Sequence, residues 1–232
     1  MMVLIIMNST VIKLEYMDLN LENFKSILYK LSKNRPIFHS EADFQHELAF
    51  IMHKHGFTPR LEIPYSNLPL DKNNSIKIEL DILLNKKIGV ELKYKTQIFK
   101  CNFGEELFKL KNHGARNLGQ FDFLDDIRRL EILKKNGIIE IGFAVLLTND
   151  NLYWESTKRK NFSKDFSIED GKKFIQNQNY NWIDNPKVSS FGKKRTSPFV
   201  PITFNRNFNI TWYNYSVFSS KYGLFKFTMV EI

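Results

Sequence analysis

The sequence predicts one α/β domain with an extended, β-rich C-terminal part. Three observations support this fold class. Helical apolar stripes alternate with short strand-like runs, 232 residues suit one domain better than two full ones, and hydrophobic residues make up 43% of the chain. We place the core at about residues 36–148 and the C-terminal extension at about residues 149–232.

The chain opens with helical signals. Residues 18–33 carry an apolar stripe at helical spacing, and Pro36 then breaks the pattern. Ser40, with Asp43 three residues later, resembles a capping box, so a second helix is expected over residues 41–55. A third helix is expected over residues 118–135, ended by an Asn-Gly pair.

Strand signals fill the spaces between these helices. A short strand over residues 60–65 is expected to close at Pro64, and a hairpin is expected around Gly104. The other expected strands cover residues 76–84, 88–94, 138–147, 208–215 and 224–232. Residues 138–147 are apolar apart from Glu140, which predicts a strand buried on both faces.

Two of these strands carry polar residues at alternating positions. In residues 76–84, the even-numbered residues from Ile76 to Leu84 share an apolar face, and Asp81 lies on the other face. A three-residue loop at 85–87 keeps apolar faces together and pairs Ile82 with Val90. The same register places Asp81 opposite Glu91, and Glu79 opposite Lys93.

This register brings two carboxylates side by side. Directly opposite residues have Cβ atoms about 4.5–5.5 Å apart, and two carboxylates at that range repel unless a cation or a proton lies between them. Mg²⁺ takes such oxygen ligands. Lys93 shares this face and could orient an attacking water. The alternative is an amphipathic hairpin whose polar face is simply solvated.

The arrangement Leu80-Asp81 … Glu91-Leu92-Lys93 resembles the core motif of the PD-(D/E)XK nuclease superfamily, with leucine in place of the family's proline. Segments at residues 40–49, 91–96 and 147–154 also resemble an uncharacterised bacterial group of this superfamily. The resemblance covers roughly the first two-thirds of the chain. It implies a restriction-endonuclease-like mixed central sheet flanked by helices.

The resemblance further implies a Mg²⁺-dependent endonuclease, with Mn²⁺ able to substitute, that acts on DNA in defence or repair and leaves a 5′-phosphate. Asp81, Glu91 and Lys93 would be catalytic, and the two acids would bind metal. A homodimer is expected from the resemblance alone. Two alternatives remain: cleavage of RNA, and a catalytically silent nuclease-like module that binds nucleic acid or assembles with partners.

The family also places an acidic residue on a helix before the sheet. In the helix after Ser40, the apolar stripe centres near Glu41, with Gln45 close beside it and Glu47 toward its edge. We therefore assign catalysis and metal binding to Glu41 and keep Glu47 in reserve. The alternative role for Glu41 is stabilisation of the first helical turn.

A formal net charge of +9 favours a polyanionic partner. The candidate nucleic-acid contacts are Gln45, Lys95, Gln120, Lys158, Arg159, Lys160, Lys193, Lys194 and Arg195. The basic runs among them are equally compatible with solvated loops. On the third helix, Asp126 and Arg129 are spaced for an ion pair, which is more often structural than functional.

Several classes are excluded or disfavoured by composition. A single cysteine, Cys101, forms neither an internal disulfide nor a cysteine-rich zinc site. The N-terminal apolar run is too short for a signal peptide or a membrane span, and it is expected to form a first strand or an arm. We therefore expect a cytoplasmic protein with no membrane partner.

Overall fold

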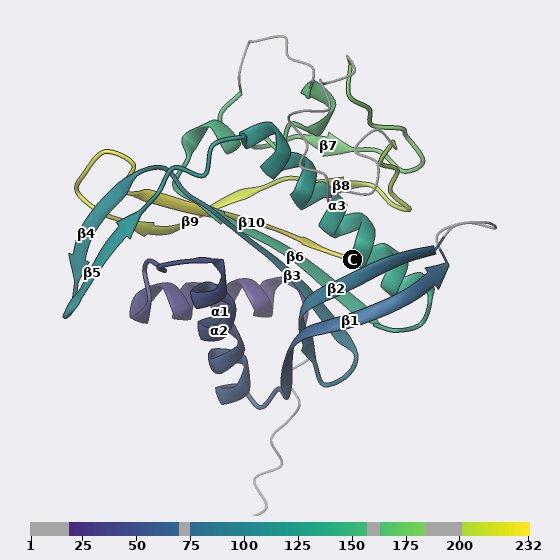
Figure 1. Ribbon diagram of the computed structural model, residues 1–232, viewed down its shortest axis with the longest axis horizontal. Helices are drawn as coiled ribbons and strands as arrows, with labels where there is room; N and C mark the ends of the chain where they lie inside the picture. The colour runs from purple at the N-terminus through teal and green to yellow at the C-terminus, as the bar shows by residue number, and fades with distance from the viewer. Residues whose placement is uncertain (1–18, 70–74, 157–162, 184–200) are drawn as a thin grey trace, which may run out of the picture.

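In the computed structural model, a six-stranded mixed sheet forms the centre of the molecule (Figure 1). The structure describes residues 19–69, 75–156, 163–183 and 201–232. The strand order is β1-β2-β3-β6-β10-β9, in which β3 and β6 run parallel and the other neighbours are antiparallel. The prediction of an α/β fold with a mixed central sheet flanked by helices is confirmed at this level.

Most elements form within a few residues of their expected bounds. The helices are α1 (Leu21–Asn34), α2 (Glu41–Lys54) and α3 (Arg116–Lys135). The strands of the main sheet are β1 (Pro59–Pro69), β2 (Ser75–Leu84), β3 (Ile88–Lys95), β6 (Ile141–Thr148), β9 (Trp212–Val217) and β10 (Leu224–Glu231). Two small ribbons are formed by β4 (Phe99–Phe103) with β5 (Glu106–Leu110), and by β7 (Lys173–Phe174) with β8 (Phe208–Asn209).

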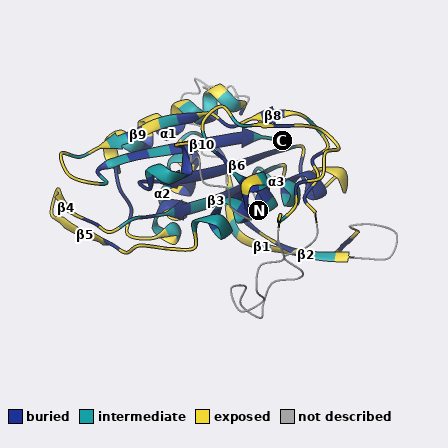
Figure 2. Ribbon diagram, turned by 90° about the horizontal axis from the view of Figure 1, so that it is seen from above, coloured by how far each residue is buried: buried dark blue, intermediate teal, exposed yellow. Residues whose placement is uncertain are grey.

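The sheet separates two apolar cores. Helices α1 and α2 cover one face, where Phe24, Phe44 and Leu48 pack against Val90 and Val145. Helix α3, with residues from 163–183 and 201–210, covers the other face. Strand β6 lies between them and is buried along almost its whole length, as its continuous apolar run predicts (Figure 2). The C-terminal strands β10 and β9 complete this same sheet beside β6.

Local signals explain where α2 begins. The Ser40 side chain accepts a hydrogen bond from the Asp43 backbone N–H at 3.1 Å, which is one half of the expected capping box. The other half of the box is not formed. The Asp43 carboxylate accepts a hydrogen bond from the His39 N–H and forms an ion pair with Arg35. The start of α2, and therefore the position of Glu41, is fixed by both contacts.

Strand β1 is longer than expected, because Pro64 does not end it. Pro64 pairs with Glu79 inside the β1–β2 ladder, and the strand continues to Pro69 with a bulge after Tyr65. Proline is tolerated here because β1 is an edge strand, where a missing N–H costs no ladder bond on the open side.

The predicted single apolar face of β2 is wrong. Ile78 and Leu80 pack in the core under α3, whereas Ile82 and Leu84 pack in the core under α1 and α2. The exchange occurs opposite Glu62, whose backbone is left-handed with φ 53°. The Glu62–Asp81 rung is missing from a register that is otherwise continuous between Pro59 and Tyr65, so the β1–β2 ribbon turns at this point.

Within the described residues, no helix combines the length and apolar character that crossing a membrane requires. The N-terminal run expected to form a strand or an arm lies outside the described residues.

Candidate functional site

The candidate site lies where β2 leaves β3. Their ladder consists of Ile82–Val90, Leu83–Gly89 and Leu84–Ile88, so the predicted register is confirmed there. The predicted Asp81–Glu91 and Glu79–Lys93 rungs are not formed, because β2 turns away with β1 at Asp81. The opening exposes backbone N–H groups of β3 that no strand satisfies.

Two carboxylates satisfy these backbone groups. Asp81 Oδ2 accepts the Leu92 N–H at 2.6 Å, and Glu41 Oε2 accepts the Tyr94 N–H at 2.7 Å. Charge-assisted hydrogen bonds of this kind contribute about 1.5–3 kcal/mol each. They place Asp81 from β2 and Glu41 from α2 along the same edge of β3. The charge of Glu41 contributes to raising the pKa of Asp81.

The polar face of β3 is not solvated. Glu91 is 1% exposed, and α3 packs over this face of the strand. Lys93 Nζ lies 2.8 Å from Asp126 Oδ2, and Arg129 lies 3.1 Å from both Glu91 Oε1 and Asp126 Oδ1. The alternative of an amphipathic hairpin with a solvated polar face is therefore excluded for Glu91 and Lys93.

Four acids and two bases thus meet between β2, β3, α2 and α3. We call this group the carboxylate cluster; its members are Glu41, Asp81, Glu91, Asp126, Lys93 and Arg129. Asp126 and Arg129 were expected only as a structural pair on α3. Their spacing of three residues was the available signal, but which face of α3 meets β3 is decided by tertiary packing.

Three acids of the cluster, Asp81, Glu91 and Asp126, resist ionisation. Burial, followed by the charge of Asp126, raises the pKa of Glu91 well above its usual value. Burial also raises the pKa of Asp81, although Lys93 and the Leu92 N–H oppose this effect. Burial raises the pKa of Asp126 to about 6, against the attraction of Lys93 and Arg129. The acids outnumber the bases, so the cluster lacks positive charge.

Lys93 remains charged in this surrounding. Burial alone would lower its pKa, but the charges of Asp126, Asp81, Glu41 and Glu91 together raise the pKa of Lys93 above its ordinary value. Its Nζ also donates to the Leu92 carbonyl at 3.0 Å. Lys93 is therefore a fixed ammonium inside the cluster.

The cluster contains the oxygen donors that a hard divalent cation takes. Four carboxylates face two fixed cations, which leaves two negative charges if all acids ionise. Both carboxyl oxygens of Glu91 are buried and accept no hydrogen bond in the described structure. Among the described residues, no three His, Cys, Asp or Glu side chains already converge as a metal cage. In the present arrangement Lys93 and Arg129 supply the counter-charge.

Gln45 and Glu47 take different places. Gln45 is buried, and its side-chain amide donates to the Asp81 carbonyl at 2.8 Å and to the Glu62 carboxylate. It therefore supports Asp81 where the Glu62–Asp81 rung is missing, and we treat it as a positioning residue. Glu47, the reserve for Glu41, points instead to Arg35 at 3.8 Å.

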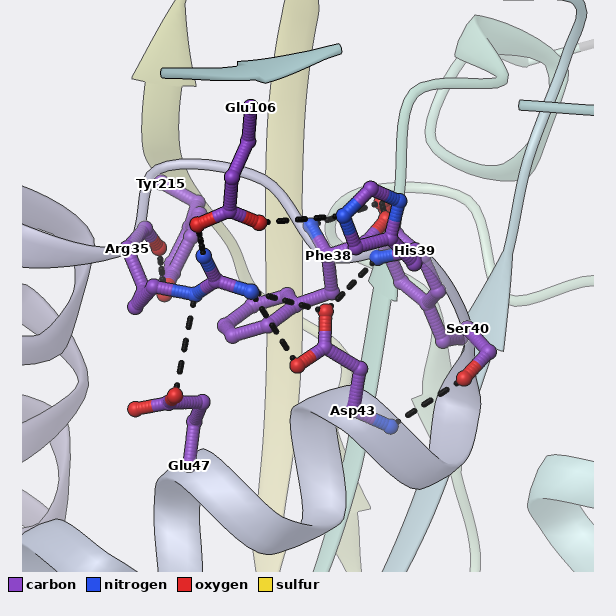
Figure 3. Close-up of polar contacts among 9 residues, drawn as sticks. Arg35, Phe38, His39, Ser40, Asp43, Glu47, Glu106 and Tyr215 are labelled. Atoms are coloured by element: carbon purple, nitrogen blue, oxygen red, sulfur yellow. Dashed lines mark hydrogen bonds and ion pairs between the residues drawn. The ribbon is translucent and has the colours of Figure 1, made fainter. Parts of the chain in front are cut away.

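Arg35 joins three elements near the start of α2 (Figure 3). Its guanidinium contacts Asp43 and Glu47 on α2 and Glu106 on β5, and Glu106 also bonds His39 at 3.0 Å. This network anchors the β4–β5 hairpin beside the helix that carries the first acid of the cluster.

The other predicted nucleic-acid contacts are less defined. Lys95 is half-buried at the end of β3, and Gln120 is half-buried near the start of α3. The basic runs at residues 158–160 and 193–195 lie outside the described residues.

Comparison of the chain with protein-family models, with curated proteins and with solved structures finds no match. The functional argument therefore depends on the geometry and charge of the cluster.

Proposed function

We propose that the chain is a divalent-metal-dependent endonuclease that hydrolyses DNA, with its reaction centre in the carboxylate cluster. The observation that carries this proposal is the excess of buried carboxylates around Lys93, including Glu91, which is buried with one ion pair, to Arg129, among the described residues. Strongly perturbed acids gathered around one ammonium are typical of functional sites rather than of cores.

Asp81, Glu91 and Glu41 would hold the ion, for which Mg²⁺ is the expected species and Mn²⁺ a substitute. The bound ion would polarise a phosphoryl oxygen and acidify a water. The chain's own groups complete the site: Lys93 offers a fixed positive charge to a phosphate and a donor to the attacking water. Asp126 holds that ammonium in place, and Gln45 holds the backbone of Asp81.

The proposal is tested by incubating the purified protein with supercoiled, linear and branched DNA in Mg²⁺ or Mn²⁺. Cleavage leaving 5′-phosphate ends is expected, and Glu91→Gln should reduce its rate by about 100-fold or more. Glu140→Gln is a matched control, because Glu140 is an exposed acid paired only with Lys87 in the described contacts. Equal, negligible cleavage by the wild type and Glu91→Gln on every DNA would overturn the proposal.

A nuclease-like module without catalysis is the second candidate. Asp81 and Glu41 already bond backbone N–H groups, so they have a structural use that needs no metal. This candidate predicts DNA binding that is indifferent to Mg²⁺, with no cleavage. A parallel digest of RNA separates DNA cleavage from the remaining possibility, an RNA nuclease.

A further inference from the structure

The β4–β5 hairpin has one face packed and one face open. Phe99, Phe108 and Leu110 are buried in the core under α1 and α2. On the opposite face, Lys100 and Lys109 are exposed and lie directly across from each other in the ladder. Like charges in directly opposite positions destabilise a two-stranded ribbon. The hairpin therefore carries a charge arrangement that folding alone does not favour.

The open face is positive in its lower part, nearest the base of the hairpin. Lys111 continues the row toward the base of the hairpin, and Asn102 and Leu107 form the next exposed pair toward its tip. Of the two acids in the hairpin, Glu106 is paired with Arg35 and His39 (Figure 3). The other, Glu105, belongs to the turn at the tip. We call Lys100, Lys109 and Lys111 the lysine face.

The base of the hairpin is fixed beside the carboxylate cluster. Thr96 follows β3 directly; its Oγ1 donates to the Lys111 carbonyl at 2.6 Å, and its N–H donates to His113 Nδ1 at 3.0 Å. His113 lies within electrostatic range of Lys95 and of Glu41. The β4–β5 hairpin projects from the end of the sheet at which β3 ends (Figure 1). Thr96 therefore ties Lys111, at the base of the hairpin, to the end of the strand that carries Glu91 and Lys93.

We propose that the lysine face binds the sugar-phosphate backbone of duplex DNA next to the carboxylate cluster. This inference rests on the proposed function and extends it by naming a second contact surface for the same substrate. Lysine ammonium groups suit phosphates as point charges. A surface that binds single-stranded DNA needs aromatic side chains on which the bases stack. The open face of the hairpin offers Lys, Asn and Leu side chains instead.

The geometry limits how far this contact extends. Lys100 follows Lys93 by seven positions, so their Cα atoms are at most about 25 Å apart. At about 3.4 Å per base pair, the contact falls within about seven base pairs of the reacting phosphate. A duplex that ends fewer base pairs from the cleavage position, on the side bound by the hairpin, should lose the contact with the lysine face.

The experiment measures binding without cleavage. The full chain is titrated in EDTA with a labelled 20-base-pair DNA duplex at several KCl concentrations, as wild type, Lys100→Ala/Lys109→Ala and a control, Lys134→Ala/Lys135→Ala. The control removes the same charge from the exposed C-terminal end of α3, away from the hairpin (Figure 1). Removing two phosphate contacts should reduce the steepness of the plot of log K against log salt concentration by about 1.8. At 0.1 M salt this corresponds to a loss of about 60-fold in affinity for the duplex. The control should keep the wild-type slope.

Three results would overturn the inference: no duplex binding by the wild type, an unchanged slope in the hairpin variant, or an equal loss of affinity for a single DNA strand of the same sequence. Misfolding is excluded by thermal unfolding, because removing two exposed, opposed lysines should not lower the melting temperature.

The cleavage assay is scored separately. If the wild type cuts DNA but the hairpin variant binds normally, only this inference fails; if the wild type never cuts but the variant loses binding, only the nuclease proposal fails.

Discussion

Replacing Asp126 by Asn should stabilise the protein at neutral pH and impair its activity. Asp126 is almost fully buried, and its pKa is raised to about 6 from an ordinary value of 3.8, chiefly by burial. Between these two values the folded protein keeps the proton and the unfolded chain releases it. Unfolding therefore releases a proton in this window, and stability falls as pH rises from about 4 to 6.

The magnitude follows from the same values. A rise from 3.8 to about 6 corresponds to about 3 kcal/mol, at about 1.4 kcal/mol per pKa unit. Breaking a buried ion pair commonly costs about 3–5 kcal/mol, but that cost arises from a stranded partner charge. Here Lys93 keeps Asp81, Glu41 and Glu91 as neighbours. The neutral amide should therefore gain up to about 3 kcal/mol at pH 7.5 and almost nothing at pH 4.

Urea unfolding of the wild type and Asp126→Asn at pH 4, 5, 6 and 7.5 measures this difference. Asp125→Asn is the matched control, because Asp125 is half-exposed and paired with Arg128 on the same helix; its effect should stay within about 1 kcal/mol. The reasoning is refuted if Asp126→Asn is less stable than the wild type at pH 7.5, or if the difference between them does not change with pH. DNA cleavage should fall in Asp126→Asn, because Lys93 loses its nearest anchor.

Three other outcomes follow from the same geometry. Mn²⁺ at about 100 times its Kd should stabilise the wild type by about 2.7 kcal/mol in calorimetry, and Asp81→Asn/Glu91→Gln should show no such gain; an equal gain would argue against the site. Gln45→Leu should cost about 1–3 kcal/mol in urea unfolding, because it strands the Asp81 carbonyl; a neutral result would contradict that support. Gly119→Ala should destabilise by about 1–3 kcal/mol, because its Cβ would lie 2.1 Å from Tyr153 Oη, and Tyr153→Phe should recover part of the loss; no recovery would point to another contact.

The elements whose position depends on local signals could be predicted from the sequence. The cap at Ser40 fixes the start of α2, and side-chain alternation with an odd loop length gives the Ile82–Val90 register. Both depend on residues close together in the chain. The turn of the ribbon at Glu62 could not be predicted, because glutamate has no preference for the left-handed region in which the structure places it.

The membership of the site was predicted only in part. The motif supplied Asp81, Glu91 and Lys93, and the helical stripe favoured Glu41 over Glu47. The structure brings the first four together and leaves Glu47 with Arg35. The contribution of α3 depends on how a helix more than twenty residues further along packs onto β3. Neither hydrophobic pattern nor charge spacing within the helix determines that rotation.

Backbone capping explains some acids of the cluster but not their excess. Leu92 and Tyr94 need one acceptor each, and a neutral asparagine or serine could supply it without burying a charge. Glu91 bonds no backbone group in the described structure, and its burial raises its own pKa. A cluster selected for stability would replace Glu91 with an apolar residue and release Arg129. The bonds from Asp81 and Glu41 to the strand instead hold two carboxylates in fixed positions beside β3, and this fixed placement is what the proposed divalent-cation site relies on.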